Sequence, residues 1–153
     1  MREILFKGRR IDNGEWKEGC LVIDESRSNH YKYRIQPKES GNLLAYAINP
    51  ETICQYTGLV DKNGKKIWEN DILMCHGNPD DLVKAVFGEF GVRNAETGTI
   101  TDRVIGWHYE VVLTDEISKT VPFCYSMPLT KYYIERCEME IVDNPELLSE
   151  VHK

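Results

Sequence analysis

The sequence lacks the short residue spacings that build metal sites and disulfide frameworks. Its five cysteines are an odd number and lie far apart, and neither Cys-x-x-Cys nor His-x-x-x-His occurs. A zinc site would have to be assembled from distant residues, for example Cys75, His108, Cys124 and Cys137. We expect buried free thiols instead, and neither a metal nor another cofactor.

Long apolar runs and an excess of positive charge are also missing. No stretch approaches the roughly 20 apolar residues that a membrane-spanning helix needs, which predicts a cytosolic, unprocessed chain without a membrane partner. Lys and Arg number 19 against 25 Asp and Glu, for a net charge of −6. A globally basic nucleic-acid coat is therefore excluded, and nucleic acid is a disfavoured partner. Most of the negative charge falls in the second half of the chain.

No catalytic motif is present. A nucleophile elbow of the form Gly-x-Ser-x-Gly does not occur, and the acidic pairs lie in expected turns. Strand alternation places His108 on the face opposite Trp107 and Tyr109, where an exposed or groove-side imidazole could act as a general base but has no evident partner. The alternative is a hydrolase whose site combines distant residues such as Asp71, His76 and His108. We expect a non-enzymatic protein.

What the chain does contain is a period of two in its apolar residues. Residues 31–36 and 103–113 alternate strictly, which predicts strands with one buried face. Residues 72–75 and 83–87 are apolar on both sides, as in strands that are covered twice or that bend around a small barrel. A polar turn is expected between them, over residues 78–82. The fold class is therefore mainly β.

Two Asn-Gly corners give the strongest local signals. Residues 12–14 and 61–64 both end in Asn-Gly, the pair that tolerates the positive φ of tight hairpins. The only clear helix signal is at the end of the chain, where Asn144 would cap a short helix over residues 145–151 that begins with proline. A boundary near residues 64–70 would divide the chain into an N-terminal β lobe, 1–66, and a second lobe, 67–153.

Two groups of residues are candidate contacts for a partner. Arg9 and Arg10 belong to a basic cluster in the first ten residues. This cluster could meet an acidic surface or phosphate, although the more ordinary interpretation is the solvated side of an edge strand. The second group is Phe123, Tyr125 and Met127, an aromatic and thioether cluster between two prolines that would be a plausible contact if exposed.

Several of these segments resemble the YopX family of small phage and prophage proteins. The similarity lies in residues 1–10 with 13–16, in residues 55–73, in residues 86–91 and in residues 143–148. It thus covers both ends and the middle of the chain. One departure is Asn70, where family members commonly have glycine before Asp-Ile; asparagine also tolerates positive φ, so the turn should be kept.

The resemblance implies a mainly β protein whose later portion, from about Asp71, forms an SH3-like barrel. It carries over no catalytic residues, and a function inferred from such a barrel would be analogy only. The expected role is a phage or prophage accessory protein in the bacterial host cytoplasm that binds a protein partner. The alternatives are a nucleic-acid-binding SH3-like module and a self-assembling structural subunit, that is, a homo-oligomer.

Overall fold

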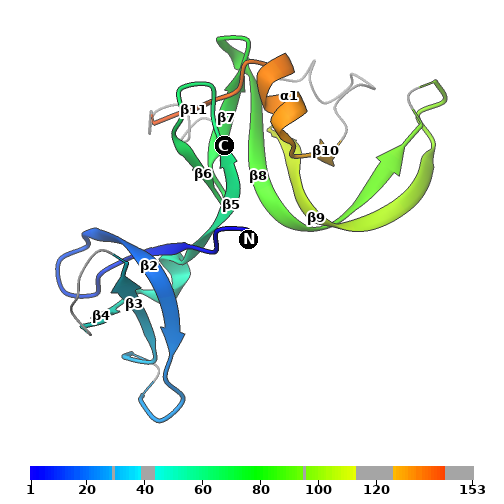
Figure 1. Cartoon of the computed structure of the whole chain (residues 1–153). Helices are drawn as coiled ribbons and strands as arrows, with labels where there is room; N and C mark the ends of the chain where they lie inside the picture. The colour runs from blue at the N-terminus through cyan, green and yellow to red at the C-terminus, as the bar shows by residue number, and fades with distance from the viewer. Residues whose placement is uncertain (29, 39–43, 95, 113–125, 144–153) are drawn as a thin grey trace. The chain divides into compact units, whose positions relative to one another are not determined.

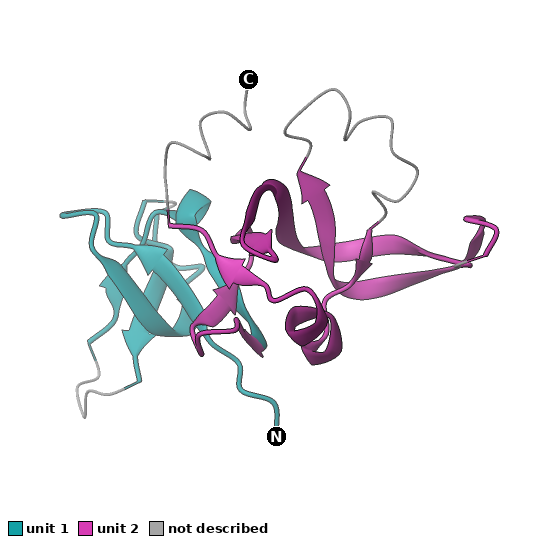
Figure 2. Cartoon of the chain, turned by 90° about the horizontal axis from the view of Figure 1, so that it is seen from above, with its two compact units in different colours: residues 1–58 teal, residues 59–153 magenta. Residues whose placement is uncertain are grey.

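The computed structural model describes residues 1–28, 30–38, 44–94, 96–112 and 126–143. The chain divides into two compact units, unit 1 over residues 1–58 and unit 2 over residues 59–153 (Figure 2). Both are built from antiparallel sheet, so the predicted mainly β class is confirmed. The division falls before the predicted 64–70 because Leu59 and Ile67 pack with the core of unit 2.

The first sheet has the strand order β4-β3-β2-β1-β5-β6. Its elements are β1 (Phe6–Arg9), β2 (Trp16–Ile23), β3 (Tyr33–Pro37), β4 (Tyr46–Ala47), the 3-10 turn η1 (Pro50–Thr52), β5 (Cys54–Val60) and β6 (Lys66–Trp68). β1 pairs with both β2 and β5. The basic cluster therefore lies on a central strand, and its interpretation as the side of an edge strand is wrong.

The interior of unit 1 forms where the chain after β4 returns to the end of β1. Arg10 and Ile48 form an isolated bridge, and Ile48 and Ile35 are completely buried. Gly8 faces Ile48 so closely that a β-carbon at this position would collide with the isoleucine side chain. The missing side chain at residue 8 therefore allows residues 48–52 to lie against β1, and this contact positions the site described below.

Both Asn-Gly corners are turns, as predicted. Gly14 and Gly64 have φ of 70° and 81°, values that glycine adopts without steric cost. The second turn joins β5 to β6 and is organised by buried Asp61, whose Oδ1 accepts hydrogen bonds from the backbone N–H groups of Asn63 and Lys65, each at 2.9 Å. The Asp61 Oδ2 accepts a third from the N–H of Ile141 at 3.0 Å, which ties the turn to the end of the chain.

Unit 2 contains a second sheet of order β10-β9-β8-β7-β11. Its elements are β7 (Ile72–Cys75), β8 (Asn78–Arg93), β9 (Ile100–Val112), β10 (Met127–Pro128), helix α1 (Lys131–Arg136) and β11 (Glu140–Ile141). Ile134 of α1 packs with Leu73, Ala85 and Tyr109 in the core of this unit. In the described residues the order ends at β10 and β11 without closing, so the sheet there is not a closed barrel.

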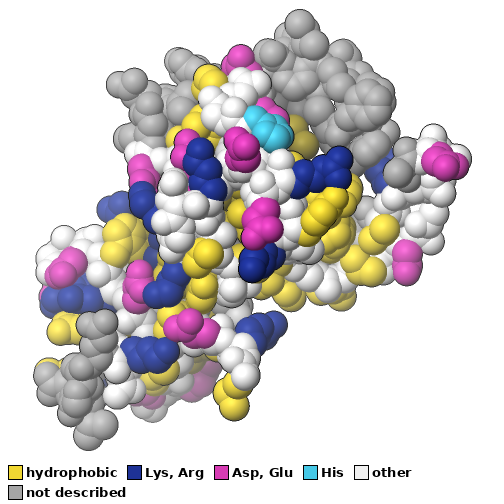
Figure 3. Space-filling model, turned by 45° about the horizontal axis from the view of Figure 1, so that its top comes forward, with side chains coloured by type: hydrophobic (Ala, Val, Ile, Leu, Met, Phe, Trp, Pro, Cys, Tyr) yellow, Lys and Arg dark blue, Asp and Glu magenta, His cyan; other side chains and the backbone are white. Residues whose placement is uncertain are grey.

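β8 and β9 form a long curved ribbon that extends beyond this core (Figure 1). Alternation predicts that Ile105, Trp107 and Tyr109 share a buried face. Tyr109 is buried and Trp107 half-buried, but Ile105 is 73% exposed because its part of the ribbon has no core beneath it. Hydrophobic side chains consequently show on the ribbon at the right of Figure 3.

Two local predictions differ from the structure. The expected polar turn over residues 78–82 belongs to β8, and the chain turns instead at His76 and Gly77, which both have positive φ. The only helix among the described residues longer than a 3-10 turn is α1, which has no counterpart in the predicted elements. The predicted helix over residues 145–151 lies outside the described residues. No helix in the described part of the chain is long and apolar enough to cross a bilayer.

Candidate binding site

An open pocket of about 700 Å³ lies in unit 1, beside the end of β1. This volume is within the range of about 300–1,000 Å³ that is typical of ligand sites. The pocket joins three parts of the chain: the end of β1 with the turn after it, the loop before β3, and the start of η1. Its lining consists of Arg9, Arg10, Ile11, Gly14, His30, Asn49, Pro50 and Glu51.

Strand alternation sends the two arginines in different directions. A β-carbon added at Gly8 would point toward Ile48. Because successive side chains of a strand alternate, Arg9 points to the opposite, outer face of β1. Arg9 is paired across the strands with Trp16, and its guanidinium carbon lies 5.1 Å from the centre of the indole ring. Trp16 is 42% exposed. Arg9 and Trp16 thus present a cation and an aromatic surface to solvent.

The backbone of Arg9 is fixed on both sides. Its N–H donates to the Thr52 hydroxyl at 2.8 Å, and its carbonyl accepts from the N–H of Asn49 at 2.9 Å. The Asn49 side chain in turn caps η1 by accepting from the N–H of Glu51 at 3.1 Å. The guanidinium itself forms no ion pair with any of the described carboxylates. The backbone of Arg9 is therefore held in place, and the charge of its guanidinium is available to a ligand.

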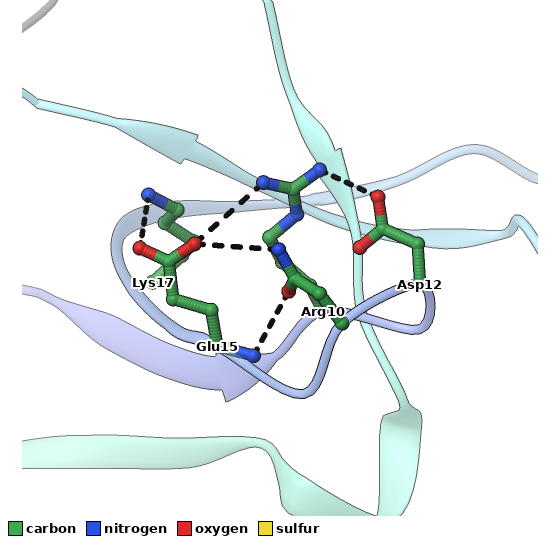
Figure 4. A network of polar contacts seen from close by, with 5 residues as sticks. Arg10, Asp12, Glu15 and Lys17 are labelled. Atoms are coloured by element: carbon green, nitrogen blue, oxygen red, sulfur yellow. Dashed lines mark hydrogen bonds and ion pairs between the residues drawn. The ribbon is translucent and has the colours of Figure 1, made fainter.

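Arg10 is held by its own turn (Figure 4). Its guanidinium pairs with Asp12 at 2.6 Å and with Glu15 at 3.7 Å, and the guanidinium carbon lies 4.4 Å from the centre of the Tyr46 ring. Lys17 pairs with Glu15 at 3.1 Å, and its hydrogen bond and charge hold the pKa of that carboxyl below its ordinary value. The charge of Arg10 is therefore already compensated.

Cations and carboxylates are balanced around the pocket. Three cations, Arg9, Arg10 and Lys17, lie near as many carboxylates, Asp12, Glu15 and Glu51, but only Arg10 and Lys17 form ion pairs with them. The site therefore has no strong positive field of the kind that gathers several phosphates at once. It offers one uncompensated guanidinium, an exposed imidazole at His30 and the apolar side chains of Ile11 and Pro50. This arrangement suits a single carboxylate or other oxyanion next to an apolar group.

His108 lies elsewhere, on β9 of unit 2. The register places it on the opposite face from Tyr109, as predicted, but it is only 2% exposed rather than open to a groove. Its ring stacks on Phe90 with centroids 4.6 Å apart, Nδ1 lies 3.1 Å from the Gly106 carbonyl oxygen, and Nε2 lies 3.4 Å from the Glu110 carboxylate. This histidine fills space beside β8.

Asp71 of the proposed hydrolase set has a structural contact. The Asp71 carboxylate accepts a hydrogen bond from the N–H of Trp68 at 2.8 Å and so closes a turn. Among the described residues, no group of three or more histidine, cysteine or acidic side chains is arranged to hold a metal ion. Within this part of the chain, Asp71, His76 and His108 therefore do not form a metal site.

Comparison with known proteins decides the family. The model of the family described as YopX protein matches residues 6–149, which is nearly the whole chain and includes every residue of the pocket. The chain belongs to the YopX family. No curated protein matches it. The resemblance proposed from the sequence is confirmed, and the pocket lies within the part that this YopX family member shares with its family model.

The departure at Asn70 keeps the expected turn. In this YopX family member Asn70 has φ of 71°, and its N–H donates to the carbonyl of Ala85 at 2.7 Å. Asparagine adopts this conformation more readily than most residues with a side chain. The turn that places β7 is therefore preserved.

Of the second group of predicted contacts, only Met127 lies within the described residues. Phe123 and Tyr125 lie outside the described residues. Met127 pairs with Tyr109 on β9 and packs against the core of unit 2, so it supports that core instead of forming an exposed contact. Of the predicted contact residues, Arg9 and Arg10 are the two that the structure brings together.

The cysteines of unit 2 are structural in character. Burial raises the pKa of the Cys75 thiol to about 12, with smaller contributions from Asp81 and Cys137. Burial also raises the pKa of Cys137. Both thiols are therefore protonated at neutral pH. Cys124 lies outside the described residues.

Sequence reasoning missed half of the pocket. His30, Asn49 and Glu51 are not part of any recognisable motif, and they meet Arg9 only because the chain after β4 returns to β1. The single local signal was Asn49-Pro50, which is typical of a capped turn. That signal identifies a turn but not a binding site.

Proposed function

We propose that this YopX family member is a non-enzymatic binding module that recognises a protein partner through unit 1. The observation that supports it is the open pocket beside Arg9, a cation with a fixed backbone and no ion pair to the described carboxylates. A charged hydrogen bond to a guanidinium is strong and directional, and an adjacent exposed tryptophan adds contact area at low entropic cost. Both are typical of protein recognition sites.

Nucleic acid is the second candidate. The exposed Trp16, with Lys7 and Arg9 over its ring, resembles the combination of aromatic and cationic groups that binds single strands. The carboxylates around the pocket oppose it, because each would repel a neighbouring phosphate. Affinity for nucleic acid also requires several phosphates to be neutralised together, and the protein carries a net charge of −6.

The finer aspects of the fold and setting are part of the proposal. We propose that unit 2 is an SH3-like barrel. Its strand order supports this, since four consecutive strands form a meander and β11, after the short α1, returns to pair with β7. We further propose a phage or prophage accessory role in the bacterial host cytoplasm. A self-assembling subunit is the competing structural role, which light scattering at several protein concentrations would detect.

Affinity capture with the full-length protein from nuclease-treated host extract, followed by mass spectrometry, tests the function. We expect a protein that the bait retains and an unrelated acidic bait of the same size does not. The captured partner, once purified, should bind this protein in solution, and its covalent mass should be unchanged after incubation. Material that is captured from untreated extract but lost after nuclease treatment would favour the nucleic-acid alternative. A partner whose covalent mass changes on incubation would contradict a non-enzymatic role.

A further inference from the structure

We propose that the pocket binds an acidic peptide segment in which an aspartate or glutamate stands next to an apolar residue, with Arg9 as the carboxylate-binding residue and Arg10 as a positioning residue. This inference rests on the proposed function and specifies the partner chemistry. It assigns different roles to two adjacent arginines that the sequence does not distinguish.

The role of Arg9 follows from its side of the strand. It is directed outward, opposite Trp16, and its backbone is anchored by Thr52 and Asn49. Its guanidinium can therefore offer parallel N–H donors to a carboxylate without first breaking an ion pair to a described residue. Contact with the indole limits the motion of the guanidinium, so less entropy is lost when a ligand binds.

The role of Arg10 follows from its contacts. It is joined to Asp12 and Glu15 and lies over Tyr46, and its backbone N–H donates to the carbonyl of Glu15 at 2.9 Å. These contacts connect the turn after β1 to β4 across the wall of the pocket. A ligand carboxylate would have to compete with two carboxylates already present. Arg10 therefore maintains the shape of the wall rather than supplying binding charge.

The other lining residues indicate which kind of residue stands next to the acidic residue of the peptide. Ile11 and Pro50 provide apolar surface for a short side chain. The Glu51 carboxylate lies in the same lining and can accept hydrogen bonds from backbone N–H groups of a peptide. A peptide supplies all three features, namely a carboxylate, an apolar side chain and N–H donors. Glu51 repels any negative charge, so it disfavours a run of several phosphates more strongly than a single carboxylate that Arg9 can neutralise.

Selection from a displayed library of random heptapeptides on the full-length protein tests the inference. We expect enriched peptides to contain an acidic residue next to an apolar one. The best peptide, synthesised with a fluorescent label, should bind Arg9→Ala roughly 10- to 100-fold more weakly than the parent, the loss expected for one charged hydrogen-bonding group. Its twin with asparagine or glutamine in place of the acid should be weakened similarly. Lys38→Ala removes an exposed unit 1 cation outside the pocket and should bind normally.

Conservative variants separate the two arginines. Arg10→Ala should weaken peptide binding because the wall of the pocket becomes less rigid. Arg10→Lys should retain most of the affinity because lysine can still pair with Asp12 and Glu15. Arg9→Lys should stay weak because an ammonium cannot reproduce the two parallel donors. Circular dichroism and the melting temperature of each variant show whether it is folded, and the Arg9→Lys result stands even if Arg10→Ala is unstable.

Several outcomes would overturn the inference. They are an absence of enriched peptides, enriched peptides without acidic residues, equal binding to Arg9→Ala, full recovery in Arg9→Lys, and displacement of the peptide by short DNA or RNA at moderate salt. Capture of a partner that still binds Arg9→Ala would leave the proposed function in place and refute this site. Acidic peptides that bind through Arg9 without any captured protein would support the site and count against the proposed function.

Discussion

At the scale of single residues, Asp61 is the most consequential polar group in the described structure. Its buried carboxylate accepts three backbone hydrogen bonds, two within the β5–β6 turn and one from Ile141. We expect Asp61→Ala to lower the free energy of unfolding by roughly 2–4 kcal/mol, because buried donors lose a charged acceptor. Urea unfolding followed by tryptophan fluorescence measures the change.

The matched control for Asp61 is Asp143. This carboxylate is 74% exposed and pairs with Lys65 at 3.0 Å on the surface. Removing it should change stability by less than about 1 kcal/mol. Asp61→Asn keeps one acceptor oxygen and should fall between the two. Equal stability of Asp61→Ala and Asp143→Ala would show that the buried carboxylate does not organise the turn.

Gly64 isolates the effect of backbone conformation. Its φ is 81°, and a β-carbon added there would meet no atom within 4 Å. Gly64→Val should therefore destabilise the protein by about 1–2 kcal/mol through backbone strain alone. Gly64→Asn should cost less, since asparagine tolerates this region. Identical thermal melting of Gly64→Val and the parent would contradict the assigned turn.

Asp61 and Gly64 show what the sequence can and cannot predict for single residues. Asn-Gly predicts the turn at residue 64 because the requirement for positive φ is local. The second role of Asp61 depends on Ile141, which is 80 residues away, and no local pattern reports such a contact. In the same way, the sequence predicts that Arg9 and Arg10 belong to a basic cluster. It cannot show that, of these two arginines, only Arg10 contacts Asp12, Glu15 and Tyr46.

At the scale of elements, strands were easier to predict than the helix. Alternation locates much of β3 and β9, because a period of two is a strong local signal, and short apolar runs locate β7 and part of β8. Helix α1 has six residues and contains two adjacent tyrosines, which favour strand. The buried Ile134 and the cap at Thr130 decide the outcome, and the first of these depends on tertiary packing.

The cap of α1 can be tested directly. The Thr130 hydroxyl accepts a hydrogen bond from the N–H of Tyr133 at 3.2 Å. Thr130→Ala should lower stability by about 1 kcal/mol, because an N–H at the start of the helix loses its partner. Thr130→Asp should retain the hydrogen bond and the stability. If alanine and aspartate at this position have the same chemical denaturation midpoint, the cap does not contribute.

At the scale of the whole molecule, the sequence predicts two parts but places their boundary too late. The structure divides after Gly58, because Leu59 and Ile67 pack with the core of unit 2. The pocket illustrates the same limit. Its lining comes from residues 9–11, 14, 30 and 49–51, and the return of the chain to β1 brings residues 49–51 beside the end of that strand. Only a three-dimensional arrangement reveals that these residues share a site.

The two units should respond differently to alkaline pH. Burial raises the pKa of Cys75 from 9.0 to about 12 and also raises that of Tyr109, and both side chains belong to the core of unit 2. Their protonated forms persist in the folded state after the unfolded chain has begun to lose these protons. The stability they support is therefore complete below about pH 9 and declines as the pH rises toward 12. In unit 1 Tyr56 has a raised pKa for the same main reason, burial, but its shift is smaller.

Unfolding by urea at neutral pH and at about pH 10.5 measures this difference, since the higher value lies between the ordinary and raised thiol pKa. Trp16 reports on unit 1, and Trp68 and Trp107 report on unit 2 in the Trp16→Phe variant. We expect the unit 2 signal to shift to lower urea at the higher pH by more than the Trp16 signal does. Cys75→Ala should reduce that shift because it removes one of the groups with a raised pKa in unit 2, even though the variant is less stable at neutral pH. Equal pH shifts in parent and variant would mean that the protonated thiol does not contribute to the stability of the unit 2 core.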